Sequence, residues 1–174
     1  MSHAKSFRTR LKIYRIAQPG ERPAVVGIGG LGHLAVQYAK AAGFTTIAIS
    51  HSADKDKLVR ELGADEIVRD GKGLAAVGGA DVILGTSNSV GRLVLMGFEN
   101  KPLAVHPGDL IMRRIRILGS QQNDREYLYE ALQIAASGKV KVMTETYSLD
   151  EITKAYERVA EGKARFRAVI TTSN

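Results

Sequence analysis

The chain has 174 residues, enough for one domain with a full hydrophobic core and too few for two ordinary domains. Hydrophobic residues make up 44% of it and charged residues 25%, which excludes an intrinsically disordered chain. Cysteine is absent, which excludes disulfides and thiolate metal sites. The four histidines, His3, His33, His51 and His106, have no spacing typical of a metal site, so we predict none.

The formal charge of +7 raises the alternative of a nucleic-acid-binding protein. Lys and Arg are spread along the chain, however, and aromatic residues make up 6% of it without a stacking pattern. We therefore favour a basic surface that attracts a small anionic ligand. No apolar run approaches membrane-spanning length and no signal peptide is recognisable, so a soluble, cytoplasmic protein is expected.

The pattern along the chain is that of alternating strands and helices. The turn signal PGERP at 19–23 separates a basic N-terminal segment, 1–22, from one domain at 23–174. Strands are predicted at 24–28, 45–50, 65–69, 80–86, 91–98, 113–120 and 166–171, and helices at 31–42, 52–63, 124–138 and 148–162. This alternation predicts an α/β fold with a parallel, doubly wound sheet.

One connection does not fit this pattern. Between the apolar stretches ADVILGTS and GRLVLMG only residues 88–90 intervene, whereas neighbouring parallel strands need a crossover of roughly ten residues or more. Either the two strands have an irregular or antiparallel connection, or a crossover helix is missing from this sequence. We favour the missing helix, because both strands are otherwise well formed.

The segment GIGGLG fits the pattern G-x-G-x-x-G with Gly27, Gly29 and Gly32. The first glycine permits a tight turn, the second lets the backbone approach a pyrophosphate, and the third allows close packing of helix on strand. The N-terminus of the following helix then offers N–H groups and a positive dipole to phosphates. A strand precedes this segment and a helix follows it, so the sequence predicts dinucleotide binding.

The end of the second strand favours NADP over NAD. An NAD site has a carboxylate there for the ribose hydroxyls, but this strand ends at Ser50. Ser50 and Ser52 can donate hydrogen bonds to a 2′-phosphate, and Lys55 can supply charge. His51 is either a further donor or an exposed loop residue. A nucleophile elbow, a P-loop and the Tyr/Lys pair of short-chain dehydrogenases are all absent, so we name no catalytic residue.

These residues resemble the cofactor domain of zinc-dependent medium-chain alcohol dehydrogenases, in the branch of cinnamyl alcohol dehydrogenases. The resemblance covers about residues 19–171 and rests on GxGGxGH together with SxSxxK after the second strand, and on RELGADEIV, GRLVLMGF and RIRILGS. It implies a single-domain Rossmann fold, an NADP(H) cofactor with Ser50, Ser52 and Lys55 at the 2′-phosphate, and hydride transfer between the nicotinamide and an alcohol or aldehyde.

The resemblance also implies further cofactor contacts. Gly29, Gly30 and Leu31 match backbone positions at the pyrophosphate. The remaining matched positions, at the riboses, the nicotinamide and the phosphates, are Thr86, Ser87, Asn88, Met96, Gly97, Gly119, Ser120 and Arg167. Arg167 is alternatively a solvated strand residue. The edge strand 113–120 implies a homodimer, since an exposed edge needs cover.

The chain departs from the family in lacking the N-terminal domain that carries the catalytic zinc on Cys, His and Cys or a carboxylate. We therefore expect an NADP(H)-binding domain that is incomplete for catalysis alone. The alternatives are a dinucleotide sensor that binds cofactor without turnover, and a basic nucleic-acid binder. A methyltransferase is a weaker alternative.

Overall fold

The computed structural model describes residues 17–85, 91–95, 102–119 and 125–172. Six strands form one parallel sheet in the order β3-β2-β1-β4-β5-β6. They are β1 Pro23–Val26, β2 Ile47–Ile49, β3 Glu66–Val68, β4 Val82–Leu84, β5 Arg92–Leu95 and β6 Arg116–Gly119. This is the strand order of a doubly wound, Rossmann-type sheet, so the predicted fold class is confirmed.

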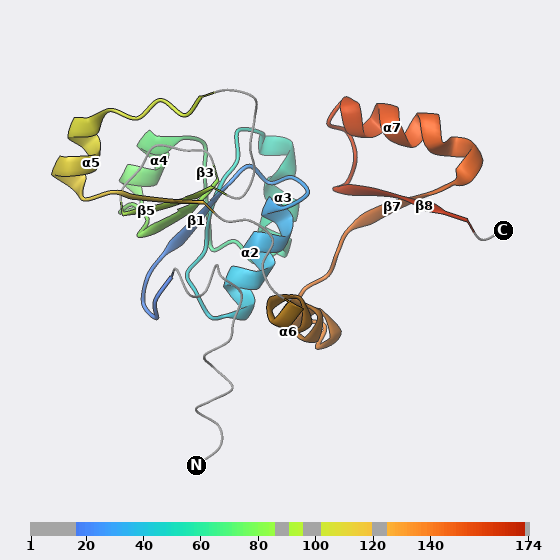
Figure 1. Cartoon of the computed structure of the whole chain (residues 1–174), viewed down its shortest axis with the longest axis horizontal. Coiled ribbons are helices and arrows are strands. Elements are labelled where there is room, and N and C mark those ends of the chain that lie inside the picture. The colour runs from blue at the N-terminus through green and yellow to red at the C-terminus, as the bar shows by residue number, and fades with distance from the viewer. Residues whose placement is uncertain (1–16, 86–90, 96–101, 120–124, 173–174) are drawn as a thin grey trace, which may run out of the picture.

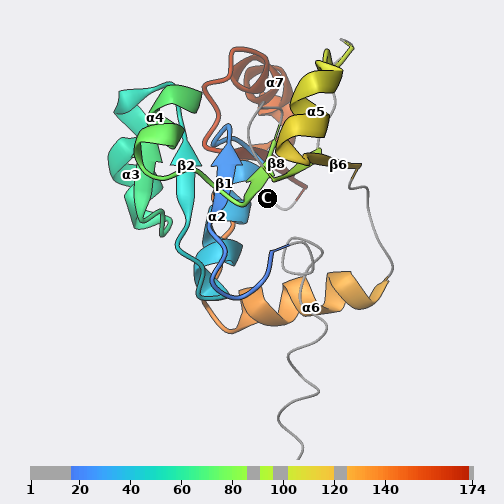
Figure 2. The same cartoon turned by 90° about the vertical axis from the view of Figure 1, so that its left-hand side faces the viewer.

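Helices cover both faces of this sheet. The helices beside it are α2 Gly32–Ala41, α3 Asp56–Glu61, α4 Gly71–Ala76 and α5 Pro107–Arg113. Figures 1 and 2 show α2 and α3 on one side of the sheet and α4 and α5 on the other. The central strands β1, β2 and β4 consist of apolar residues because both of their faces are buried: in β1, Val25 packs with the α2 and α3 side, and Ala24 with the α4 side.

The connection between β4 and β5 corrects part of the sequence-based prediction. The two strands pair in parallel, with Val82 opposite Arg92, so the antiparallel alternative is wrong. Both strands are shorter than predicted, which leaves residues 85–91 to join them. An extended chain of this length spans about 23 Å, whereas a three-residue strand is about 10 Å long. The chain can therefore return to the start of β5 without a helix.

Two short helices were not predicted, although each begins at a recognisable cap. The Asp70 carboxylate accepts a hydrogen bond from the Gly73 N–H at 2.8 Å and caps α4. His106 Nδ1 accepts from the Gly108 N–H at 3.2 Å, and Pro107 follows at the first position of α5. Their six and seven residues are too few for a clear apolar period.

The C-terminal part of the chain forms a helix and a small separate sheet. Helix α6, Arg125–Ala136, packs beside α2, where the Tyr38 hydroxyl donates to the Ala131 carbonyl at 3.1 Å. Beyond it, strands β7 Thr144–Ser148 and β8 Arg167–Thr171 pair in parallel, joined through helix α7 Ile152–Ala160. The predicted strand at 166–171 therefore exists, but it lies outside the six-stranded sheet, beside a strand that was not predicted (Figure 1).

Besides the bond from Tyr38, two hydrogen bonds from Gln37 hold this C-terminal part against α2. The Gln37 side chain donates to the Lys141 carbonyl at 3.0 Å and accepts from the Lys141 N–H at 2.7 Å. Gln37 itself is 8% exposed and Lys141 is exposed, so these bonds are partly shielded from water. The start of the segment that leads to β7 is thereby fixed on α2.

Candidate functional site at the glycine-rich turn

The turn between β1 and α2 is shaped by two of its glycines. Gly27 follows the strand with φ +78°, a conformation that side chains other than glycine rarely adopt, and its N–H donates to the Ile49 carbonyl at 3.2 Å. A Cβ placed on Gly32 would lie 2.0 Å from the Gly27 carbonyl oxygen. The helix therefore begins in direct contact with the end of the strand.

The N-terminus of α2 is open to an anion. No side chain caps it at Leu31, and its first turn contains no acidic residue. A Cβ at Gly29 would meet no atom within 4 Å, so the space over the turn is free there. Because the first N–H groups of a helix lack intrahelical acceptors and carry a partial positive charge, this geometry suits a phosphate.

Ser50 comes directly after β2, at the same edge of the sheet as the turn. Ser50 is 4% exposed. Its N–H donates to the Val68 carbonyl at 2.9 Å, and its hydroxyl donates to the Ser52 carbonyl at 3.3 Å. His51 and Ser52 are exposed, and Lys55 is half-buried. The predicted 2′-phosphate residues are thus clustered, with Ser50 the least accessible among them.

The Asp54 carboxylate, which the sequence favours as a charge at a helix N-terminus, lies in the first turn of the short helix Ala53–Lys55 and within this cluster. The Ser52 hydroxyl donates to the Asp54 carboxylate, and this hydrogen bond lowers the pKa of Asp54, helped by the charges of Lys55 and Arg165. Ser52 is therefore not a free donor in this structure. Asp54 bears directly on the choice between NADP and NAD, since a carboxylate repels a 2′-phosphate.

The segment 165–167 crosses the turn from the C-terminal unit. The Phe166 carbonyl oxygen lies 3.5 Å from a Cβ placed on Gly30, and the Phe166 ring stacks on the His33 ring with centroids 4.4 Å apart. Arg167 directly follows Phe166 and is exposed, so its backbone lies beside the turn, and its charge contributes, behind the effect of burial, to a lowered pKa of His33. The sequence pattern contains His33 as the last residue of GxGGxGH but assigns it no role, and Phe166 lies in no motif.

Glu145 on β7 anchors that segment. Its carboxylate accepts from Arg158 Nε at 2.6 Å and Nη2 at 2.8 Å, from the Tyr147 hydroxyl at 2.6 Å, and from the Arg165 N–H at 2.9 Å. These donors, with the Arg158 side chain foremost, lower the pKa of Glu145 to about 2. The backbone before Phe166 is therefore held by a charged hydrogen-bond network.

The other predicted contacts are less informative. Gly119 ends β6 beside Leu95 at the carboxyl edge of the sheet and is exposed. Thr86, Ser87, Asn88, Met96, Gly97 and Ser120 lie outside the described residues. Within the described ranges, no three His, Cys, Asp or Glu side chains are grouped so that they could hold a metal ion, and no helix is long and apolar enough to cross a membrane.

The fold, the glycine-rich turn and the uncapped helix define a domain of the class that binds dinucleotides. The family model described as zinc-binding dehydrogenase matches residues 30–137, more than half of the chain. The chain therefore belongs to the zinc-binding dehydrogenase family, and the resemblance seen in the sequence is confirmed.

Among relatives, an alcohol dehydrogenase of Geobacillus stearothermophilus is 36% identical over 88% of this chain and 51% of its own length. A probable cinnamyl alcohol dehydrogenase of Arabidopsis thaliana is 32% identical over 97% of this chain and 51% of its own length. The crystal structure of the alcohol dehydrogenase of Aeropyrum pernix matches with a TM-score of 0.80 at 32% identity, covering 91% of this chain and 52% of that one. The chain spans about half the length of the curated relatives it matches.

The alignments also show that this chain is shorter within the matched region. The Geobacillus alignment has 173 positions but covers 88% of the 174 residues here, about 153, so about 20 positions face no residue of this chain. The Arabidopsis alignment has 186 positions and covers 97%, about 169 residues. A shortfall of this size is similar to the length of one crossover helix with its turns.

Proposed function

We propose that this chain binds a nicotinamide dinucleotide with its pyrophosphate on the backbone of Gly27, Gly29, Gly30, Leu31 and Gly32. The observation that carries the proposal is the uncapped N-terminus of α2 beneath open space at Gly29. We assign a further positive charge to Arg167, which follows Phe166 at the turn and is exposed. Membership of a dehydrogenase family supports the same ligand.

For the cofactor we propose NADP(H), bound at its 2′-phosphate by Ser50, Ser52 and Lys55, with His51 beside them. The missing carboxylate at the end of β2 supports this choice. The Asp54 carboxylate instead supports NAD(H). It accepts a hydrogen bond from Ser52 and could accept hydrogen bonds from ribose hydroxyls in the same way. NADP(H) binding requires Ser52 to turn from Asp54 to the phosphate.

The reaction we propose for the complete system is hydride transfer between the nicotinamide and an alcohol or aldehyde. Two relatives are named as alcohol and cinnamyl alcohol dehydrogenases, which supports this substrate class. In this proposal the chain supplies the position of the cofactor; among the described residues no three His, Cys, Asp or Glu side chains are grouped to hold zinc as the electrophile. A dinucleotide sensor without turnover is the second candidate, favoured by this lack of a donor set.

Calorimetric titration of the full chain with NADPH and with NADH tests the proposal. We expect binding of both, with NADPH the tighter, and no aldehyde reduction with or without added zinc. Tighter binding of NADH would overturn the cofactor assignment and leave the fold-based site in place. Binding of neither, together with salt-sensitive affinity for duplex DNA, would favour the nucleic-acid alternative.

A further inference from the structure

His33 is a buried polar residue whose role is not explained by packing alone. It lies in the first turn of α2 and is 0% exposed. Its Nδ1 is 3.0 Å from the Gly29 carbonyl oxygen, and since a carbonyl accepts, the ring donates from Nδ1. The His33 backbone N–H donates to the same oxygen at 3.1 Å. Two donors therefore keep this oxygen directed into the protein, away from an anion over the turn.

The other ring nitrogen shows that the ring is neutral. His33 Nε2 is buried and has no hydrogen-bond partner among the described residues. A charged ring would bury a second N–H without an acceptor, at considerable cost. Burial and, secondarily, the charge of Arg167 on β8 lower the pKa of His33, against the raising effect of the Gly29 and Gly30 backbone. A neutral ring is also the form that stacks on an aromatic ring without being desolvated as an ion.

Phe166 connects the His33 ring to the C-terminal unit formed by β7, α7 and β8. The two rings are 4.4 Å apart between centroids and 9° from parallel. Phe166 packs against the core cluster shared by β1, α2 and α3. Its neighbours Arg165 and Arg167 are both exposed, and the Arg165 N–H is held by Glu145 from the far side. The segment is thus fixed at one end by the stack and at the other by β7.

We propose that His33 is a positioning residue of the dinucleotide site. It orients the Gly29 carbonyl through Nδ1, and through its stack on Phe166 it holds Arg167 beside the turn, so that the turn and segment 165–167 act as one anion site. This inference rests on the proposed dinucleotide binding.

A double-mutant cycle on the full chain tests the coupling through NADPH affinity. Arg167→Gln alone is expected to weaken binding about tenfold, the size of a charge-assisted hydrogen bond. Phe166→Leu keeps the apolar volume but loses the stack, and about tenfold is expected there too. If Phe166 positions Arg167, the double variant loses little more than either single variant. Additive losses, about a hundredfold together, would overturn the inference.

The role of His33 is tested by two substitutions and one spectrum. His33→Phe keeps a stacking ring but loses the Nδ1 donor, and we expect it to weaken NADPH affinity about tenfold. Phe166→Tyr keeps the stack, and its NADPH affinity should stay within about twofold of wild type. Imidazole ¹⁵N shifts of the unsubstituted chain should show a protonated Nδ1 and a bare Nε2 at neutral pH. An Nε2–H tautomer, or His33→Phe with wild-type affinity, would overturn the assignment.

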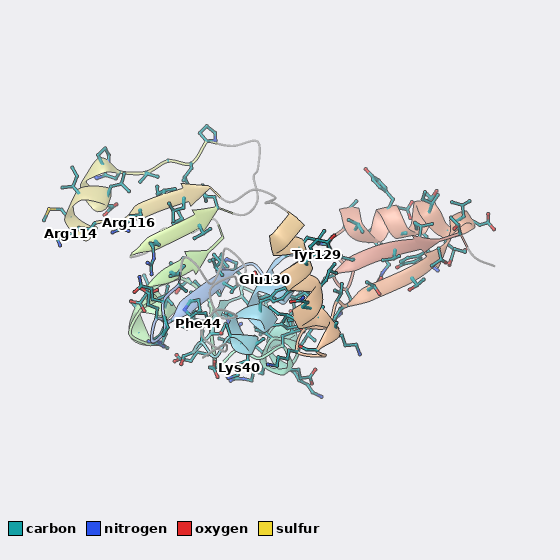
Figure 3. The ribbon with its side chains drawn as sticks, turned by 60° about the horizontal axis from the view of Figure 1, so that its bottom comes forward. Lys40, Phe44, Arg114, Arg116, Tyr129 and Glu130 are labelled. Carbon is teal, nitrogen blue, oxygen red and sulfur yellow. The ribbon has the colours of Figure 1, made fainter. Side chains whose placement is uncertain are left out.

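Arg116→Gln is the matched control. It removes the same charge at the first residue of β6, far from the C-terminal unit (Figure 3), and should leave NADPH affinity unchanged. If the unsubstituted chain binds neither NADPH nor NADH, the proposed function itself fails. If it binds and the cycle is additive, the positioning role alone fails.

Discussion

Two glycines of the same turn differ in the space that their surroundings leave for a side chain. At Gly32 a Cβ would lie 2.0 Å from the Gly27 carbonyl oxygen, whereas at Gly29 it would meet nothing within 4 Å. Gly29 also has no positive φ, so a side chain there causes no backbone strain. The fold therefore requires glycine at position 32. At position 29 the fold tolerates a side chain, so a need for glycine there would come from a bound ligand.

Gly32→Ala should lower the free energy of unfolding by about 1–3 kcal/mol, because the added methyl group forces α2 away from β1. Urea denaturation followed by circular dichroism measures this loss. Gly119→Ala, where a Cβ also has open space, is the control and should unfold like wild type. An unchanged midpoint for Gly32→Ala would mean that the helix does not sit so close to the strand.

Gly29→Val should leave the urea midpoint close to that of the unsubstituted chain and abolish NADPH and NADH binding in calorimetry. The valine fills the open space in which the pyrophosphate is proposed to lie. Affinity retained in a folded Gly29→Val variant would place the dinucleotide elsewhere.

Asp54→Asn should raise the affinity for NADPH relative to NADH by about fivefold, because a like charge is removed from the 2′-phosphate cluster and the Ser52 hydroxyl is released. Calorimetric titration with both cofactors measures the ratio. A ratio that falls would show that Asp54 does not face the adenosine ribose.

At the scale of elements, the C-terminal unit depends on one carboxylate. Glu145 joins β7 to the end of α7 through Arg158 and to the start of β8 through the Arg165 backbone. Its pKa is about 2 in the folded chain and ordinarily 4.5. A carboxyl whose folded-state pKa is lowered stabilises the fold above its unfolded pKa and loses this contribution as the pH falls through the folded value.

The unsubstituted chain should therefore melt at a higher temperature than Glu145→Gln at pH 7, and this difference should shrink between about pH 4.5 and about 2. Thermal scans across that range measure it. Glu161→Gln, which removes a carboxylate from an exposed pair with Lys163, is the control and should show little difference at any pH. A constant difference for Glu145→Gln would mean that its charge is not what joins the unit.

Sequence patterns located the long elements and missed those defined by tertiary contacts. The strands around Val25, Ile47 and Ile83 were predictable because they are buried on both faces and therefore continuously apolar. Strand β7, TETYS, is mostly exposed and lacks an apolar run, so no pattern marked it. The glycine turn follows from local spacing, whereas the contact of Phe166 with His33 joins distant segments and has no local signature.

At the scale of the whole molecule, no described strand pairs with one edge of the six-stranded sheet. Within the described residues strand β6 pairs with β5 alone, and Leu118 on it is 36% exposed. The adjacent α5 exposes Ile111 and Met112 by 73% and 84%. We propose that a second copy of this chain covers this edge, because unpaired strand groups next to apolar side chains favour strand addition.

Leu118→Lys should convert a dimer into a monomer, since two lysines would face each other across the proposed two-fold axis. Sedimentation velocity at several concentrations measures the change. Val142→Lys, at an exposed valine between α6 and β7, should leave the assembly unchanged. A monomeric unsubstituted chain would rule the dimer out.

The stack of Phe166 on His33 also bears on synthesis by the ribosome. Translation produces the glycine turn and α2 early and residue 166 more than a hundred residues later. The sheet's first strands can form while the chain is still emerging, but one wall of the proposed nucleotide site is contributed last. A nascent chain stalled before residue 166 would thus present the turn without Phe166 and Arg167, and under the proposed function a dinucleotide would bind it more weakly until translation passed that point.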